Sequence, residues 1–152
     1  FSRDVRVTTI YEGTNGIQAM DLVGRKLMDG GDAAFRLFDE IEDLSETARA
    51  TLPDLAEPVW QACETLRETT EALTAIDMSQ RFAGAVPYLM GFARVLGGYY
   101  HLRAAMAAPE AAPARLARFY ITRLLPEHAA QLAHARAGAA DLMALTPDDL
   151  AA

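Results

Sequence analysis

Residues 55–76 read LAEPVWQACETLRETTEALTAI. Apolar and small residues recur in this stretch at intervals of three and four, which places them along one side of an α-helix. They are Leu55, Val59, Ala62, Cys63, Leu66, Thr69, Thr70, Leu73 and Ile76. A stripe kept over about six turns is typical of a helical bundle, because each helix must cover its apolar side against other helices.

A second predicted helix precedes this stretch. It begins with Asp32 as its expected N-cap and extends to about Ala50. Pro53 separates the two helices, because proline disrupts the interior of a helix. Acidic residues between Asp39 and Glu57 lie opposite the apolar stripe. A basic partner would fit this acidic run, but we favour a solvated helix face.

Two more predicted helices follow. Ser79 is the expected N-cap of the first, which is kinked or restarted at Pro87 and ends near Ala107. This helix is apolar on almost every side, so we expect it to be the central one. The last long helix runs from about Ala114 to about Ala137 and is perturbed by the proline within it. Short connections between these helices favour antiparallel neighbours.

One further helix is predicted at the N-terminal end. It begins near Thr14 or Asn15 and ends at Gly30-Gly31, since glycine commonly follows the last turn of a helix. The predicted fold class is therefore all-α: an up-down antiparallel helical bundle with an additional N-terminal helix. We divide the chain into two parts, residues 1–30 and residues 31–152.

Composition narrows the possible functions. The chain has 152 residues and a net charge of −7, which disfavours binding to nucleic acid or to anionic membranes. The most apolar stretch, residues 82–106, contains Pro87, Arg94 and Arg103, so a buried helix is expected there in place of a membrane span. One cysteine rules out an internal disulfide, and we therefore expect a reducing compartment, the cytoplasm.

Several residues that often carry chemistry are given structural interpretations. Cys63 lies on the apolar stripe and is expected to be a buried hydrophobic residue. The three histidines, His101, His128 and His134, lack the separation of three or four residues that a pair of helical metal ligands needs, so no metal site is predicted. Gly97-Gly98 is expected to permit close helix packing.

Residues 9–18 read TIYEGTNGIQ and differ in kind from the rest. Glu12 ends a stiff apolar segment, and desolvation there would raise the pKa of its carboxylate toward the range of a general base. Gly13 has no side chain, so a ligand can approach the backbone. The free N–H groups of the helix start that follows can bind an anion. The same residues also fit an ordinary helix N-terminus with an acidic residue in its favoured place.

This segment, preceded by Arg3-Asp4, resembles the end of the catalytic domain of the acyl-CoA dehydrogenases. The continuation DLVGRKL, residues 21–27, resembles the subgroup with an extra C-terminal helical domain, which includes enzymes that act on 3-methylthiopropanoyl-CoA. The specific part of the resemblance covers about residues 2–28. Residues 31–152 are similar to the appended domain in length, helix pattern and the stretch at residues 85–88.

The resemblance implies an FAD-dependent enzyme that converts an acyl-CoA thioester to the 2-enoyl-CoA. Glu12 corresponds to the catalytic base that removes the α-proton, and Gly13 to a position that contacts substrate. Thr14, Asn15 and Gly16 correspond to residues beside the FAD. Many other members of the family carry a side chain at the position of Gly16, so a flavin contact there would use the backbone. Some branches place the base elsewhere, but the Tyr-Glu-Gly-Thr context favours Glu12.

The same resemblance implies an acyl-CoA substrate, electron-transfer flavoprotein as electron acceptor, a homodimer, and a place in fatty acid metabolism. Most of the flavin pocket needs residues outside this sequence. We therefore expect the chain alone to be inactive and the bundle, residues 31–152, to be structural or dimerising. The alternative is a non-catalytic helical module for interaction or oligomerisation. The identity of the acyl group cannot be read from these residues.

Overall fold

The computed structural model describes residues 13–151, and all the regular elements in this range are helical. The predicted all-α class is confirmed. In chain order the elements are α2 (Thr14–Asp21), the π-helical turn η2 (Leu22–Lys26), α3 (Asp32–Ala48), α4 (Pro53–Thr74), α5 (Met78–Ala83), α6 (Ala85–Ala107), α7 (Ala112–Arg123), α8 (Glu127–Ala135), α9 (Ala140–Ala144) and α10 (Pro147–Leu150).

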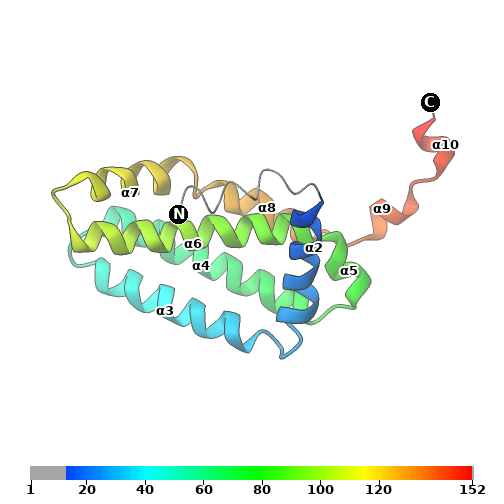
Figure 1. Ribbon diagram of the computed structural model, residues 1–152, viewed down its shortest axis with the longest axis horizontal. Coiled ribbons are helices and arrows are strands. Elements are labelled where there is room, and N and C mark those ends of the chain that lie inside the picture. Colours follow the sequence, from blue (N-terminus) through cyan, green and yellow to red (C-terminus); the bar gives the residue numbers. More distant parts are fainter. Residues whose placement is uncertain (1–12, 152) are drawn as a thin grey trace.

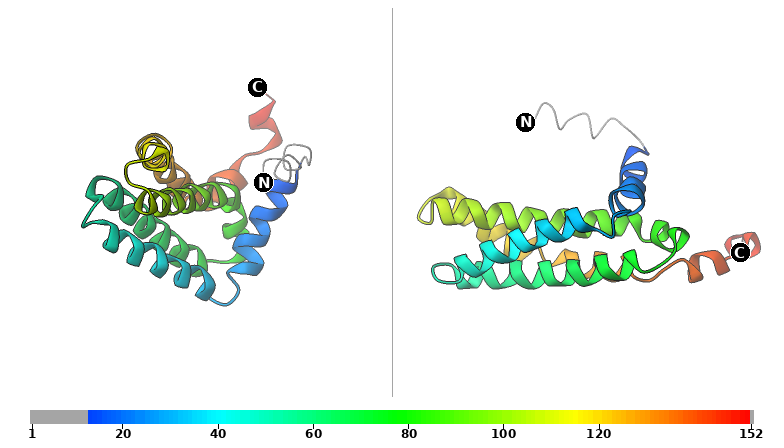
Figure 2. Two further views of the ribbon diagram at one scale, coloured as in Figure 1. Left: turned by 60° about the vertical axis from the view of Figure 1, so that its left-hand side comes forward. Right: turned by 90° about the horizontal axis from the view of Figure 1, so that it is seen from below.

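The long helices form an up-down bundle, as predicted. Figure 1 shows α3, α4, α6 and the α7–α8 pair lying lengthwise beside one another, with α2 crossing one end of the bundle at a steep angle. In Figure 2, α2 stands out from the bundle and the α9–α10 segment extends away from it. No described helix is apolar over a length sufficient to cross a lipid bilayer.

The stripe read from residues 55–76 forms the inner side of α4. Each of its members is buried except Ile76, which is partly buried. Thr69 and Thr70 are tolerated in the core because each hydroxyl donates a hydrogen bond of 2.8 Å to a backbone carbonyl one turn earlier. The Thr70 hydroxyl also lies 2.7 Å from the Tyr88 hydroxyl of α6, which joins two helices through a buried polar contact.

The helix α6 is central, as predicted from its lack of a polar side. It packs against α2, α3, α4, α7 and α8. Three glycines on α6 and at its start allow close approach. A Cβ at Gly91 would lie 2.6 Å from Leu132 Cδ2, one at Gly98 would lie 3.2 Å from Leu125 Cδ1, and one at Gly84 would meet the carbonyl oxygen of Ala135. The prediction that Gly97-Gly98 permits close packing is confirmed.

The predicted start of the fourth helix was wrong in two respects. The cap is Asp77, not Ser79: the Asp77 carboxylate accepts hydrogen bonds of 2.9 and 3.1 Å from the backbone N–H groups of Ser79 and Gln80. The helix is also divided into α5 and α6 at Gly84, before Pro87 is reached. Proline is accommodated in the first turn of α6, where its missing N–H has no intrahelical acceptor.

Two other helix boundaries also differ from expectation. The N-cap of α3 is Gly31 with φ 90°, not Asp32, because the Gly30-Gly31 turn uses left-handed conformations that glycine adopts without strain. The last long helix is divided into α7 and α8 around Pro126. Here Leu124 and Leu125 both donate to the Tyr120 carbonyl, which closes the turn before α8 begins.

We predict that Gly84→Ala destabilises the fold by about 1–3 kcal/mol, because the new methyl group would meet backbone at Ala135, which cannot rotate away. Urea unfolding followed by circular dichroism measures the difference. Gly16→Ala is the matched control, since a Cβ there meets no atom within 4 Å. Equal unfolding midpoints for the two variants would show that α6 and α8 are not held this closely.

Candidate functional site

The predicted site residues lie at the N-terminus of α2, apart from Glu12, which is outside the described residues. Gly13 is the N-cap of α2, with φ 80°, and its carbonyl accepts a hydrogen bond of 3.4 Å from the Ile17 N–H. This left-handed backbone conformation explains why position 13 is a glycine, because residues with a side chain rarely adopt it. Thr14, Asn15 and Gly16 form the first turn, so the structure brings these predicted residues together.

Within residues 13–151, the structure leaves space beside the backbone of α2 at Gly13 and Gly16. A Cβ added at Gly13 or Gly16 would meet no atom within 4 Å. Gly13 supplies no side-chain cap, and the first backbone N–H groups of a helix have no intrahelical acceptor. A neighbouring molecule can therefore approach the backbone here closely, and the helix end favours a negatively charged group.

Packing against the bundle fixes the position of α2. Ala19, Val23 and Leu27 are buried, and an added Cβ at Gly24 would lie 3.3 Å from the Phe82 ring of α5. On the outer side, the Arg25 guanidinium donates hydrogen bonds of 2.6 and 2.8 Å to Asp21. These bonds hold the pKa of Asp21 below its usual value. The motif therefore sits on a helix whose inner side belongs to the bundle core.

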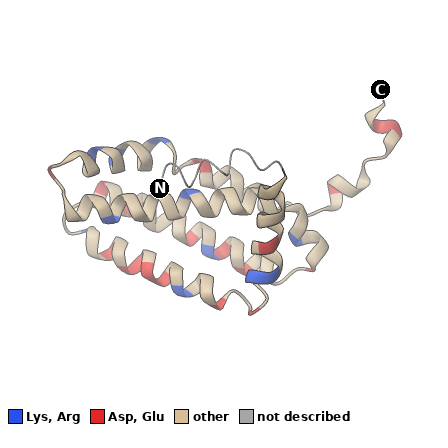
Figure 3. Ribbon diagram, in the orientation of Figure 1, with Lys and Arg blue, Asp and Glu red and all other residues tan. Residues whose placement is uncertain are grey.

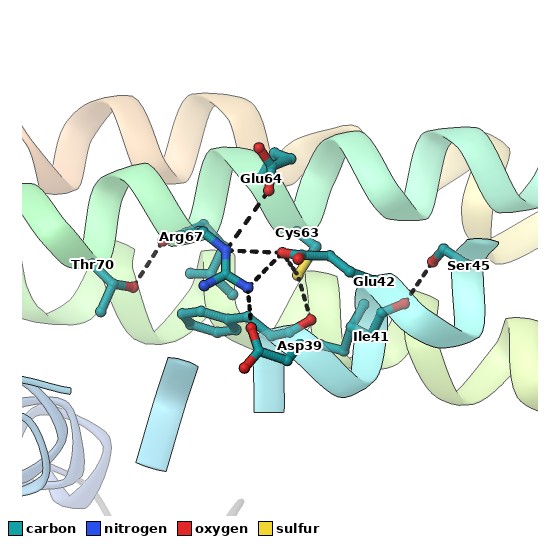
Figure 4. Close-up of polar contacts among 10 residues, drawn as sticks. Asp39, Ile41, Glu42, Ser45, Cys63, Glu64, Arg67 and Thr70 are labelled. Carbon is teal, nitrogen blue, oxygen red and sulfur yellow. Dashed lines mark hydrogen bonds and ion pairs between the residues drawn. The ribbon is translucent and has the colours of Figure 1, made fainter. Parts of the chain in front are cut away.

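The largest polar cluster among the described residues lies between α3 and α4 and is shown in Figure 4. The Arg67 guanidinium pairs with Asp39 at 2.7 Å, Glu42 at 2.8 Å and Glu64 at 3.7 Å. It also lies over the rings of Phe35 and Phe38, at 5.8 and 5.7 Å from their centroids.

Cys63 lies beside this cluster and is fully buried, which confirms the prediction from its place on the stripe. Its thiol donates weak contacts to the Phe38 carbonyl at 3.6 Å and the Glu42 carboxylate at 3.7 Å. Burial is the main cause that raises the pKa of the thiol, and the negative charge of Glu42 raises it further. The thiol therefore stays protonated at neutral pH and has no nucleophilic role.

The cluster joins two helices and lacks the features of a reactive centre. Burial and the neighbouring Glu42 raise the pKa of Glu64, while Arg67 opposes that rise. Arg49 makes a similar contact with an aromatic ring: its guanidinium carbon lies 5.1 Å from the centroid of the Trp60 ring. Across the described residues, no group of three histidine, cysteine or acidic side chains could hold a metal ion.

A shallow cleft of about 310 Å³ between α4 and the α7–α8 corner is the other candidate. Its polar lining is Gln61, Thr65 and His128. These groups already bond within their own segments: Gln61 donates to Glu57, Thr65 to the Gln61 carbonyl, and His128 Nδ1 to the Leu125 carbonyl at 2.6 Å. The cleft therefore offers no converging set of free polar groups for a substrate.

We predict that Arg67→Met destabilises the fold by about 2 kcal/mol, because it leaves three carboxylates without their shared cation. Arg118→Met is the control. It breaks the exposed pair that Arg118 forms with Asp54 at 2.6 Å, which should cost below about 1 kcal/mol. Thermal unfolding of both variants gives the comparison, and similar losses would contradict a special role for Arg67.

Comparison with known proteins shows which proteins this chain is similar to. Residues 37–146 match the family described as acetyl-CoA dehydrogenase C-terminal like. The chain is 33% identical over 115 residues to 3-methylmercaptopropionyl-CoA dehydrogenase of Ruegeria pomeroyi, a match that covers 71% of this chain and 20% of that enzyme. It thus spans about one fifth of the curated relative, and no solved structure matches it. The resemblance read from the sequence is confirmed: the chain belongs to the acetyl-CoA dehydrogenase C-terminal-like family.

Proposed function

We propose that this chain is the C-terminal part of an FAD-dependent acyl-CoA dehydrogenase and that Glu12 is the catalytic base. One observation carries the proposal: the motif TIYEGTNGIQ immediately precedes a helical domain of the acetyl-CoA dehydrogenase C-terminal-like family. The geometry of α2 is compatible with it, because Gly13 and Gly16 leave the backbone accessible at a helix N-terminus. We place the boundary between the two parts at Gly30-Gly31, where both glycines have positive φ.

Each motif residue then has a role. Glu12 accepts the α-proton of the acyl thioester, and its backbone N–H donates to the thioester carbonyl as negative charge develops there. Gly13 leaves room for the thioester, and the backbone of Thr14, Asn15 and Gly16 lies beside the FAD. Two observations support this assignment: the described residues leave space beside Gly13 and Gly16, and a helix N-terminus favours a negatively charged group. The FAD, when bound, accepts the hydride that leaves the β-carbon.

The bundle supports this chemistry without taking part in it. The described residues from 31 to 151 contain no converging reactive set, and their polar cluster at Arg67 joins two helices. We propose that the complete enzyme uses an acyl-CoA substrate, passes electrons to electron-transfer flavoprotein, works as a homodimer in the cytoplasm and serves fatty acid metabolism. The similar enzyme from Ruegeria pomeroyi is described as acting on 3-methylmercaptopropionyl-CoA, a short acyl thioester.

A non-catalytic interaction module is the second candidate. Exposed apolar side chains on α2, α6 and α9 favour it, because such surfaces commonly contact other proteins. The complete gene product distinguishes the two. A yellow protein that reduces an artificial electron acceptor in the presence of acyl-CoA supports the dehydrogenase, whereas a colourless protein that only binds a partner supports the module.

In the complete enzyme, we predict that Glu12→Gln retains the flavin but slows α-proton abstraction by about 10²–10⁴-fold, because the amide cannot accept the proton. Anaerobic stopped-flow bleaching of the flavin by acyl-CoA measures this step. Glu110→Gln, an exposed change between α6 and α7, is the control and should react at the wild-type rate. If the Glu12 variant stays within about tenfold of wild type, the base lies elsewhere.

We predict that the 152-residue chain by itself takes up no stoichiometric FAD, because it corresponds to about one fifth of the related enzyme and lacks most of a flavin pocket. Gel filtration with FAD, followed by absorbance of the protein peak, measures binding. The complete gene product run under the same conditions is the positive control. One FAD bound per isolated chain would show that the pocket lies within these residues.

A further inference from the structure

One side of α2 carries both motif glycines and two exposed apolar side chains. Gly13, Gly16, Ile17 and Met20 follow the i, i+3, i+4, i+7 spacing that aligns residues on one side of a helix. Ile17 is 67% exposed and Met20 is 45% exposed, whereas Ala19, on another side, is fully buried. The side that holds the motif glycines is therefore apolar, and it is distinct from the side that packs on the bundle.

The neighbouring helix α6 carries a similar exposed line. Val86, Met90 and Ala93 are spaced by four and three residues, which keeps them on one side of the helix, and all are exposed. The line ends before Gly97, where Tyr120 of α7 covers the same side of α6. Residues 85–107 contain no aspartate, glutamate or lysine, and their two arginines are Arg94, which pairs with Glu127 of α8, and Arg103. Val86, Met90 and Ala93 belong to the N-terminal half of α6, the half that α2 packs against and crosses in Figure 1. We call the two groups together the α2–α6 face: Ile17, Met20, Val86, Met90 and Ala93.

Most charged groups of the chain lie elsewhere. Figure 3 shows acidic residues along α3, while α6 carries no acidic residue and only the two arginines. The exposed acidic side chains of α3 include Asp39, Glu40, Asp43 and Glu46, which agrees with the predicted solvated face. A surface with such a division keeps its charged side in water, and an exposed apolar patch marks a place where another protein domain packs.

We propose that the α2–α6 face is the surface on which the flavin-binding part of the same dehydrogenase polypeptide packs. The inference rests on the proposed function. If the flavin-binding part contacts the backbone at Gly13 and Gly16, it must lie along the side of α2 that also exposes Ile17 and Met20. The related enzyme contains enough further chain to form such a domain, since the match covers only 20% of its length. The contact extends to Val86 and Met90 in this proposal, because these exposed side chains lie on the half of α6 that α2 crosses.

Methionine oxidation in the complete gene product tests this surface, because exposed methionines react with peroxide or hydroxyl radicals. Met20 and Met90, each 45% exposed in the described chain, should oxidise at least about tenfold more slowly in the native protein than after urea unfolding. Met143 is the reference and should lose little reactivity: it is 81% exposed and lies on α9, which extends away from the bundle in Figure 1. Oxidation of Met20 and Met90 as readily as Met143 would overturn the proposal.

A matched pair of variants adds a second readout. Met90→Glu places a charge in the proposed contact and should make Met20 reactive in the complete protein, whereas Leu116→Glu on exposed α7 should leave Met20 protected. If Met20 becomes reactive when the complete protein is diluted to monomers that still bind flavin, a second copy covers the face. That result would overturn the proposal.

The two proposals fail separately in this experiment. A yellow, active wild-type protein with reactive Met20 and Met90 refutes only the docking surface. A colourless protein without acyl-CoA dehydrogenase activity refutes the proposed function, on which the docking surface rests.

Discussion

The close approach of α6 to its neighbours is the constraint on which the rest of the structure depends. Gly84 and Gly91 leave no room for a Cβ, and a Cβ at Gly98 would be tight against Leu125, so α8, the Leu125 turn and α4 lie directly against the helix. Side chains larger than hydrogen at these positions would push the surrounding helices outward and lose dispersion contacts along their length. Because α6 also contacts α2 and α3, its position sets the arrangement of the whole bundle.

The arginine cluster between α3 and α4 adds a second constraint. Arg67 reaches three carboxylates on two helices and covers two phenylalanine rings, so it fixes how those helices face each other. Its energetic contribution comes from satisfying groups that would otherwise be partly desolvated without a partner. Together, glycine contacts on one side of the bundle and the cluster on the other define a single packing of helices that are individually rich in alanine.

The sequence predicted what depends on local periodicity and failed where tertiary contacts decide. The stripe of α4, the central place of α6 and the burial of Cys63 follow from residue spacing alone. The close packing at Gly84 does not, because its contact is with the backbone of Ala135, which is distant in sequence. The Arg67 cluster was also missed, since Asp39 and Arg67 meet only once two helices are placed in register. For the site, the sequence predicted a helix start near Thr14 or Asn15, and α2 begins at Thr14; the roles of these residues came from the family resemblance, and Glu12 lies outside the described residues.

A bundle without reactive groups can still be required for chemistry, and the length of α2 gives the reason. An isolated helix of eight residues is marginal in water, because nucleating it costs more conformational entropy than so few hydrogen bonds return. Burial of Ala19, Val23 and Leu27 against the bundle supplies the missing stabilisation. The first turn of α2 is thereby ordered before any ligand arrives. In a dehydrogenase, that order would lower the entropic cost of bringing base, thioester and flavin together, and the bundle would act on the reaction through the position of one helix end.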